Sequence, residues 1–486
     1  MYPTDALLRI LVHGVAVSRR MREEGHRPRQ SCIPAALSGR RERQDPYTPA
    51  GRGCPLLLWA RTPFGERRRI WQTRQTGSDP PRAGVRWCPA VSADQMLSVS
   101  YRESTMGIAR NVFAATLLAA AFSTTAFATD GDLRTGAVFV MTNQPTANQV
   151  IAYDRNADGS LVEVGRFSTG GRGDPFPQGS DPITTPLASQ GSLVVDEDGR
   201  YILAVNAKSN SLSTLRIGRT GLTQVSVAST SGKRPISIAI FSNLVYVLNE
   251  SSANDLATVK GFILGPFGRL RELPDGGRVV ASDPAFDGGQ AALDRDGRLL
   301  TITDKHFNEI TTFKVLDTGV LNEAVVTPSG GATPCGVAYD GHGHVIVSEA
   351  QGGAQLAGSV SSYGIGSGGG LSAVSSSVAD SQTSPCWVVA TRDAKFVYTA
   401  NTASGKVSSY SLGVGGGLTL LDSTASDTVS TSAVTDMALS RDGQFLYVIQ
   451  AALQSIAIFR VQADGKLVRQ PSKAGLPVGV QGIAAN

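Results

Sequence analysis

The feature that most constrains this chain is a phrase that recurs along residues 129–486. Each copy has an apolar strand, a short turn that is often Asp-Gly, and a second apolar strand that ends on a polar residue. The copies read SLVVDEDGRYILAVN, ISIAIFSNLVYVLN, AALDRDGRLLTITD, GVAYDGHGHVIVSE, VVATRDAKFVYTAN and MALSRDGQFLYVIQ. A third strand, a Gly-x-Leu turn and a fourth strand commonly follow. Four short strands that repeat about every 43–55 residues are typical of the blades of a β-propeller.

Counting the repeats predicts seven blades. The second strands are expected at 137–142, 201–205, 244–248, 298–303, 344–348, 395–400 and 444–449. A first strand precedes six of them, but the blade that starts at Gly136 lacks one. The C-terminal VQGIAAN resembles the missing strand, so we expect it to complete the first blade and close the ring. The predicted fold is therefore all-β, a seven-bladed propeller of four-stranded blades. A closed ring has no free sheet edge, and a monomer is expected.

Residues 106–128, MGIARNVFAATLLAAAFSTTAFA, have the features of a secretory signal peptide. Arg110 provides a positive start, an apolar run follows, and the segment ends on a small-x-small cleavage site, Ala126-Phe127-Ala128. The apolar run is too short for an ordinary membrane span. We therefore expect a periplasmic or secreted protein in which 129–486 form the propeller, with no membrane span after the signal is cleaved.

The preceding segment, 1–105, is expected to be a disordered or mis-assigned extension. It contains 18 arginines, no lysine and 9 acidic residues. Either Met106 is the true start of translation, or the segment is a genuine basic extension. The rest of the chain has 27 basic against 31 acidic residues. This balance gives no sign of binding to nucleic acid or to an anionic membrane, so no nucleic-acid partner is expected.

The second strands end on polar residues that should share one face. In a propeller, the corners after the second strand and before the first strand lie on the face where ligands usually bind. The expected ring comprises Asn143, Asn206, Asn249, Asp304, Glu349, Asn401 and Gln450. Such residues also satisfy the backbone of turns, and the pattern allows either role.

Two stretches place charged residues on that face. In GKRPISIAIFSNLVYVLNESS, Arg234 lies just before a first strand and Glu250 just after the next strand. In TITDKHFNEI, the corner of the fourth blade contains Asp304, Lys305 and His306. All five side chains are expected near the mouth of the central channel.

The link between the first two blades, residues 168–190, is far longer than its counterparts and is rich in glycine and proline. Loops of this length are usually functional or disordered. Two interpretations stay open: a lid that folds over the channel mouth, or a surface loop without a role.

The charged stretches resemble the seven-bladed lactonase family, which includes phosphogluconolactonase and the carboxymuconate-lactonizing enzyme. The resemblance covers essentially all of 129–486. KRPISIAIFSNLVYVLNE keeps the family's arginine and glutamate at Arg234 and Glu250, and TDKHFNEI has Lys305 where the family has an arginine. Lysine keeps the charge but loses the bidentate grip on a carboxylate or phosphate. The resemblance implies a site at the channel mouth for a small anionic lactone or sugar acid.

The sequence departs from the family one blade earlier. Where the family has histidines, SQGSLVVDED has Ser189, Gly191 and Ser192. Opening or closing a lactone requires a group that transfers protons near the ring oxygen. Glu250 is the first candidate, and His306 is a substitute from a neighbouring corner or else a solvated turn residue.

Two functions therefore stay open. In the first, the protein hydrolyses or cyclises a small anionic lactone, with Glu250 and His306 as catalytic candidates. The residues expected to bind the substrate are Arg234, Lys305, Asn206, Asn249, Asp304 and Glu349. In the second, the same face of a non-catalytic propeller binds a small anion, a polymer or an envelope protein.

No cofactor and no metal are expected. His342 and His344 lie on a turn at the opposite face, and no nearby cysteine or further histidine completes a metal-ligand set. Cys335 and Cys386 each follow a proline at the start of adjacent inner strands. They are either two buried free thiols or a disulfide at the channel rim.

Overall fold

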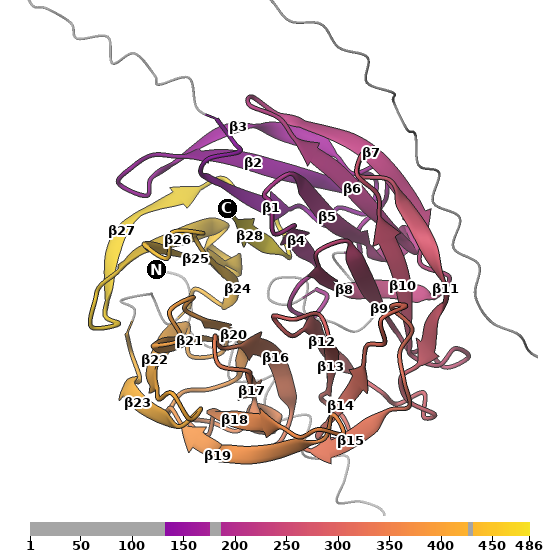
Figure 1. Cartoon of the computed structure of the whole chain (residues 1–486). Coiled ribbons are helices and arrows are strands. Elements are labelled where there is room, and N and C mark those ends of the chain that lie inside the picture. Colours follow the sequence, from indigo (N-terminus) through magenta and orange to yellow (C-terminus); the bar gives the residue numbers. More distant parts are fainter. Residues whose placement is uncertain (1–131, 175–185, 426–430) are drawn as a thin grey trace, which may run out of the picture. The chain divides into compact units, whose positions relative to one another are not determined.

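The computed structural model describes residues 132–174, 186–425 and 431–486. It contains seven four-stranded antiparallel sheets in a ring, which confirms the predicted seven-bladed propeller (Figure 1). The expected extension and signal peptide lie outside the described residues. Within the described residues, no helix has the length and apolarity that crossing a membrane requires.

Each blade consists of four strands, ordered from the centre outward. The first blade contains β28 (Ile483–Ala485), β1 (Ala137–Met141), β2 (Gln149–Arg155) and β3 (Leu161–Ser168). The second contains β4 (Leu193–Val195), β5 (Tyr201–Asn206), β6 (Ser211–Ile217) and β7 (Leu222–Ser229). The third contains β8 (Lys233–Phe241), β9 (Leu244–Glu250), β10 (Thr258–Leu264) and β11 (Leu270–Val279).

The other four blades repeat this order. The fourth contains β12 (Gly288–Leu293), β13 (Leu299–Asp304), β14 (Glu309–Lys314) and β15 (Val325–Pro328). The fifth contains β16 (Pro334–Tyr339), β17 (His344–Glu349), β18 (Ser359–Ile365) and β19 (Leu371–Ala379). The sixth contains β20 (Pro385–Ala390), β21 (Phe396–Asn401), β22 (Lys406–Leu412) and β23 (Leu418–Asp422). The seventh contains β24 (Val434–Leu439), β25 (Phe445–Gln450), β26 (Ser455–Val461) and β27 (Leu467–Ala474).

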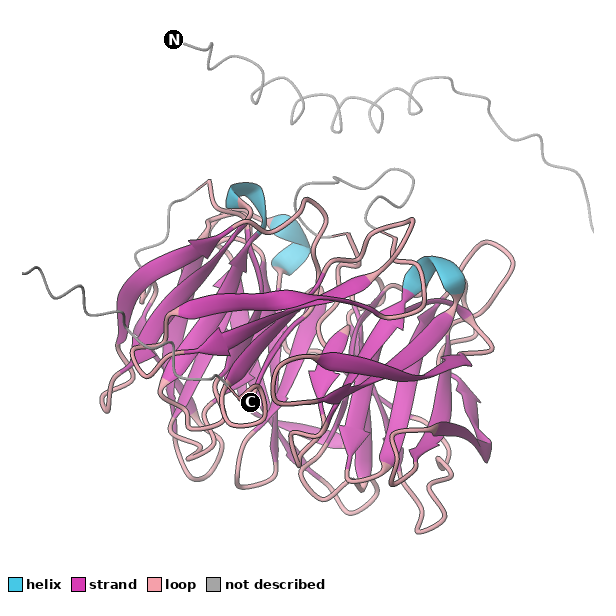
Figure 2. Cartoon of the chain, turned by 90° about the horizontal axis from the view of Figure 1, so that it is seen from above, coloured by secondary structure: helices cyan, strands magenta, loops and turns pink. Residues whose placement is uncertain are grey.

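The corners after the second strands lie together on one face, as expected. Three of them contain short 3₁₀ helices: η1 (Ala207–Ser209), η2 (Gln351–Gly353) and η3 (Ala451–Leu453). Figure 2 shows all three helices on the same side of the ring. We call this side the corner face, and we call the side with the turns between first and second strands the turn face.

The C-terminal strand closes the ring, as the sequence predicts. β28 pairs antiparallel with β1, with Val138 opposite Ala485 and Val140 opposite Ile483. The side chain of Asn486 adds two bonds, because its Oδ1 accepts from the Ala137 amide at 2.7 Å and its Nδ2 donates to the Leu133 carbonyl at 2.8 Å. The first blade therefore gains its inner strand from the other end of the chain.

Burial follows the position of a strand within its blade. Every residue of the second strands β5 and β25 is buried, because neighbouring blades cover both faces. In the outer strand β3 only Leu161 is buried and the remaining positions are exposed or half-buried. The apolar runs of the second strands thus make the core between blades, and the alternating outer strands face water.

Tyrosines on three second strands connect neighbouring blades. The hydroxyl of Tyr398 donates to the Gly465 carbonyl at 2.9 Å, and Tyr447 donates to Gly159 at 3.2 Å. Tyr246 donates in the same way to the Gly319 carbonyl. Each glycine belongs to the turn between the third and fourth strands of the next blade and has a positive φ. The repeat therefore places a buried hydroxyl and its acceptor at the same position in each of these junctions.

The segment before β4 lies in the centre of the ring. The Ser189 carbonyl accepts from Trp387 Nε1 at 3.3 Å and from Gln481 Nε2 at 3.1 Å. Gln190 spans to the sixth blade, where its side chain accepts from the Val388 amide at 2.9 Å and donates to the Val388 carbonyl at 2.8 Å. We call residues 187–191 the central segment. The residues 175–185 of the same link lie outside the described structure, so the expectation of a lid stays a prediction.

Candidate functional site

Arg234 and Glu250 form an ion pair on the corner face. Arg234 lies at the start of β8 and Glu250 at the end of β9, where Lys233 and Glu250 are cross-strand partners. Arg234 has a φ of 46°, a left-handed backbone conformation that residues other than glycine rarely adopt. Its amide donates to Asn210 Oδ1 at 2.9 Å, which helps to hold this conformation.

The guanidinium of Arg234 has two further partners. Its Nε lies 3.3 Å from Asp174 Oδ2, and its Nη2 donates to the Pro186 carbonyl at 2.7 Å. The side chains of Arg234 and Glu250 are only 23% and 14% exposed. Arg234 therefore connects the third blade to both described ends of the long link.

Lys305 holds the same link from the fourth blade. Its side chain is 8% exposed, and its Nζ lies 2.9 Å from Asp287 Oδ1. Nζ also donates to the Ala188 carbonyl at 2.8 Å. Each of the two predicted basic residues thus binds at least one carboxylate, and each also donates to a backbone carbonyl of the link.

Five charged residues make up this candidate site: Asp174, Arg234, Glu250, Asp287 and Lys305. We call them the charged cluster. Three are acidic and two are basic, so the cluster has a formal charge of −1 when all five are ionised. The arrangement is therefore a network of internal pairs and not a bare patch of positive charge.

Burial and the neighbouring charges shift two pKa values in the cluster. Burial raises the pKa of Glu250, although Arg234 and Lys305 act in the opposite direction. Burial lowers the pKa of Lys305, but Asp287 and other neighbours outweigh this effect, and the net shift is upward. A buried carboxyl with a raised pKa beside two cations can exchange a proton nearer to neutral pH than an exposed glutamate.

His306 lies at the same corner but outside the charged cluster. Its side chain is exposed, and its ring packs edge-on against Phe307 with centroids 4.7 Å apart. The His306 amide donates to Asp304 Oδ1 at 2.9 Å, and the Asp287 and Phe307 amides donate to the same oxygen at 3.3 Å. Asp304 therefore stabilises the turn, and the catalytic role of His306 stays a prediction.

Three other predicted residues are fully buried: Asn206, Asn249 and Glu349. Asn206 Nδ2 donates to Ser213 Oγ at 2.7 Å, and its Oδ1 accepts from Thr169 Oγ1 at 2.7 Å. Asn249 Nδ2 donates to Thr258 Oγ1 at 3.3 Å.

Glu349 accepts bonds from the Gly331 amide and from three serine hydroxyls, those of Ser329, Ser359 and Ser361. The structure does not bring Asn206, Asn249 or Glu349 into the charged cluster. Their geometry fits the turn-stabilising role that the sequence left open.

Ser189, Gly191 and Ser192, which stand where the resemblance would place histidines, lie in the central segment and at its edge. Ser189 Oγ donates to the Ile236 carbonyl at 2.9 Å, and Gly191 has a φ of 79°. A Cβ at Gly191 would lie 3.1 Å from Ser237 Oγ and 3.3 Å from the Ile238 carbonyl oxygen. A histidine at Gly191 would therefore need both a strained backbone and a shift of its neighbours.

Sequence reasoning missed two of the three acidic residues in the charged cluster, Asp174 and Asp287. Asp174 lies in the long link and Asp287 immediately before β12, and neither belongs to the repeated phrase. The enrichment of the SDPAFDGG corner in aspartate was a usable signal for Asp287. The contact of Asp174 with Arg234, 60 residues away, has no signal in a single sequence.

The His342–His344 turn is held by Asp340. Asp340 Oδ1 accepts from the amides of both histidines, and its Oδ2 lies 2.7 Å from His344 Nδ1. Burial opposes ionisation of Asp340, but these hydrogen bonds outweigh it and lower its pKa. Among the described residues, no group of three or more His, Cys, Asp or Glu is placed to hold a metal ion.

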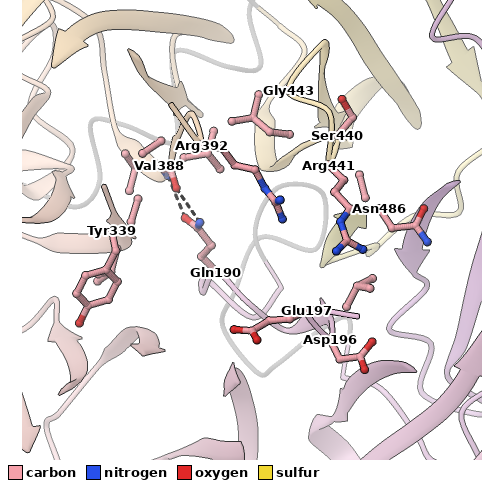
Figure 3. A pocket seen from close by; sticks show the side chains of 17 residues that line it. Gln190, Asp196, Glu197, Tyr339, Val388, Arg392, Ser440, Arg441, Gly443 and Asn486 are labelled. Atoms are coloured by element: carbon pink, nitrogen blue, oxygen red, sulfur yellow. Dashed lines mark hydrogen bonds between the residues drawn. The ribbon is translucent and has the colours of Figure 1, made fainter. Parts of the chain in front are cut away.

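A cavity of about 390 Å³ opens on the turn face (Figure 3). It is lined by the turns between first and second strands, and Arg392 and Arg441 from two of these turns point into it. Gln190 of the central segment and Glu197 also line it. Because Ala188 contacts Lys305 while Gln190 lines this cavity, the central segment separates the cavity from the charged cluster.

Comparison with known proteins supports the fold. No protein-family model matches the chain, and no curated protein matches it either. Among solved structures, a candidate 6-phosphogluconolactonase from Bacteroides fragilis has a TM-score of 0.54 and 15% identity over 72% of this chain and 97% of that one. The periplasmic gluconolactonase of Pseudomonas aeruginosa has a TM-score of 0.54 and 15% identity over 71% and 98%. A candidate 6-phosphogluconolactonase from Bacteroides uniformis has a TM-score of 0.54 and 17% identity over 71% and 99%.

At identities this low, the likeness is one of architecture, and a shared fold hosts many activities. The resemblance inferred from KRPISIAIFSNLVYVLNE and TDKHFNEI is confirmed for the fold. The protein is a seven-bladed β-propeller built like the lactonase-type structures.

Proposed function

We propose that this protein is an exported hydrolase that opens a small anionic lactone at the charged cluster. The observation that supports this function best is Glu250, a largely buried carboxyl with a raised pKa that pairs with Arg234 and interacts electrostatically with Lys305. Groups with shifted pKa values cluster at catalytic sites because proton transfer is most efficient when the pKa lies near the working pH.

The residues of the cluster have distinct proposed roles. Glu250 accepts a proton from a water molecule that attacks the lactone carbonyl, and Arg234 stabilises the negative charge that develops on the carbonyl oxygen. The ring C–O bond then breaks, and Glu250 returns the proton to the former ring oxygen, which becomes the hydroxyl of the product. Lys305 binds the carboxylate of the substrate. The substrate replaces the Pro186 and Ala188 carbonyls as partners of the two cations.

Export is part of the same proposal. It is supported by the signal-like residues 106–128 and by the likeness to a Pseudomonas aeruginosa protein described as a periplasmic gluconolactonase. The detection of the chain in a periplasmic or culture fraction, with sequencing of its N-terminus, tests this part. Recovery of the intact chain only from the cytoplasm would contradict it.

The second candidate is a propeller that binds a sugar acid without turning it over. The observation that favours it is the pairing of Arg234 and Lys305 with internal carboxylates and carbonyls, together with serine and glycine at the positions of the family's histidines. An ion-pair network of this kind also shifts pKa values for structural reasons.

The deciding experiment measures hydrolysis of a panel of aldonolactones by the purified protein, with Glu250→Gln as the test variant. Arg441→Gln on the turn face is the matched control. Turnover above the blank that is lost in Glu250→Gln and kept in Arg441→Gln supports the hydrolase. No turnover, with a sugar acid raising the Tm of the wild type but not of Arg234→Gln, supports the binding protein and overturns the hydrolase.

A further inference from the structure

Two cysteines meet in the wall of the ring, close enough to Lys305 and Asp287 of the charged cluster to interact with them electrostatically. Cys335 is the second residue of β16 and Cys386 the second residue of β20, so they occupy the same position on the first strands of neighbouring blades. Both are free thiols, and their Sγ atoms are 3.0 Å apart. At this separation, the two sulfurs need only a small movement to form a disulfide bond.

The backbone around the pair is held in place by close packing. A Cβ added at Gly336 would lie 2.8 Å from the Cys386 carbonyl oxygen, so only glycine lets the two strands approach this closely. On the other side of β16, Thr303 Oγ1 donates to the Cys335 carbonyl at 2.5 Å. A disulfide has an S–S length of about 2.05 Å, and the sulfurs reach it by moving about 1 Å closer.

The two thiols differ in access and in acidity. Cys335 is only 3% exposed, whereas Cys386 is partly exposed. The hydrogen bond from Cys335 lowers the pKa of Cys386, burial opposes this shift, and Lys305 lowers the pKa further. The same hydrogen bond and burial raise the pKa of Cys335. Cys386 is therefore both easier to reach and a better source of thiolate, the form that attacks disulfides.

We propose that Cys335 and Cys386 form a thiol–disulfide exchange site that is oxidised by a small disulfide of the glutathione type. The Cys386 thiolate attacks one sulfur of the small disulfide, whose S–S bond breaks and releases one thiol. Cys335 then loses its proton and attacks Cys386 Sγ, which breaks the mixed disulfide and releases a second thiol. In total, two protein thiols become one disulfide while one small disulfide is reduced to two thiols.

Oxidation at this site connects the fifth and sixth blades covalently. The bond joins residues separated by 51 positions in the sequence, and a cross-link of that span stabilises the fold chiefly by restricting the unfolded chain. We expect the oxidised protein to have a Tm several degrees above that of the reduced protein. This proposal is independent of whether the charged cluster is catalytic.

The test equilibrates the purified full chain in glutathione buffers with an increasing share of glutathione disulfide. Acid quenching, alkylation of free thiols under denaturing conditions and peptide mapping by mass spectrometry then locate each bond. The mapping also separates this pair from Cys32, Cys54 and Cys88 in the N-terminal segment. We expect a cross-linked Cys335–Cys386 peptide pair in the wild type, together with the higher Tm.

Two variants test the order of attack. In Cys335→Ser, Cys386 should retain one glutathione, because no second thiol releases it. In Cys386→Ser, the buried Cys335 should stay free and be alkylated after denaturation. Alkylation of both wild-type thiols at the highest share of glutathione disulfide would overturn the site. Glutathione on Cys335 in preference to Cys386 would overturn the assigned order.

Discussion

The two faces of the ring are built from the same repeat but present their charges differently. On the corner face, Arg234 and Lys305 each bind a carboxylate and a backbone carbonyl. On the turn face, Arg392 and Arg441 point into an open cavity, and neither has a hydrogen bond or ion pair with any residue that the structure describes. The central segment lies between the two.

The difference comes from the one part of the propeller that does not repeat. The link between the first two blades contributes Asp174, Pro186 and Ala188 to the corner face, and Gln190 to the cavity on the turn face. A repeated corner places an arginine or lysine at the channel mouth. The inserted segment determines whether that cation is already paired within the protein or is available to bind a ligand. Internal pairing lowers the affinity of a cation for an external anion, because the ligand must displace an existing partner.

The largest expected difference between the faces is catalytic. Glu250→Gln keeps the size of the side chain but removes the proton acceptor, so lactone hydrolysis should fall by about 100-fold or more, whereas Arg441→Gln should leave it unchanged. Because burial raises the pKa of Glu250, the wild-type rate should rise with pH over a range above that of an ordinary glutamate. Initial rates between pH 4 and 9 check both points, and equal losses in the two variants would contradict the assignment.

The second prediction concerns the pH dependence of stability and Asp436, which lies in β24 in the ring wall between the two faces. This carboxyl is 2% exposed, its Oδ1 accepts from the Met437 amide at 3.0 Å, and burial raises its pKa to about 8. The folded state then holds a proton that the unfolded state releases above pH 4, so stability should fall as the pH rises from about 4 to 8.

The Asp436→Asn variant should lack this part of the pH dependence, with a Tm several degrees above the wild type at pH 8 and a smaller difference at pH 4. Thermal unfolding at both pH values measures the effect. The same pH profile in wild type and variant would show that Asp436 is ionised in the folded protein.

Arginine substitutions compare the stability of the two faces directly. Arg234→Gln leaves Glu250 and Asp174 without their cation and frees the Pro186 carbonyl, and it should cost about 1–3 kcal/mol of unfolding free energy. Arg441→Gln removes no described partner and should change stability by no more than about 0.5 kcal/mol. Urea denaturation of the two variants gives both numbers. A cost for Arg441→Gln as large as that for Arg234→Gln would show that the turn face is also paired internally.

A smaller effect than that of Arg234→Gln is expected for Gln190, whose side chain reaches from the central segment to the sixth blade. Gln190→Ala removes two hydrogen bonds to the Val388 backbone. Water from the open cavity can replace them in part, so the cost should be about 1 kcal/mol. Urea denaturation measures it, with lactone hydrolysis as the second readout. A large loss of hydrolysis without a loss of stability would show that the two faces communicate through the central segment.

Local sequence patterns were sufficient to predict the fold and part of the candidate site. The repeated phrase predicted seven blades and the closure by the C-terminal strand, because alternation and turn residues are properties of neighbouring positions. It also placed Arg234, Glu250 and Lys305 at one mouth, since each corner of a repeat lies on a known face. For Asn206, Asn249 and Glu349 the same pattern allowed both a ligand role and a turn role, and their complete burial favours the turn role.

The sequence by itself therefore determined the architecture, the boundaries of the seven second strands to within two residues, and the face on which the charged residues gather. Only the tertiary structure decided that Asp174 and Asp287 pair with the cations, that residues 187–191 fill the centre of the ring, and that Cys335 and Cys386 meet. The physical reason is that strands and turns depend on interactions between near neighbours. Pairing, burial and pKa depend instead on which distant segments the closed ring brings into contact.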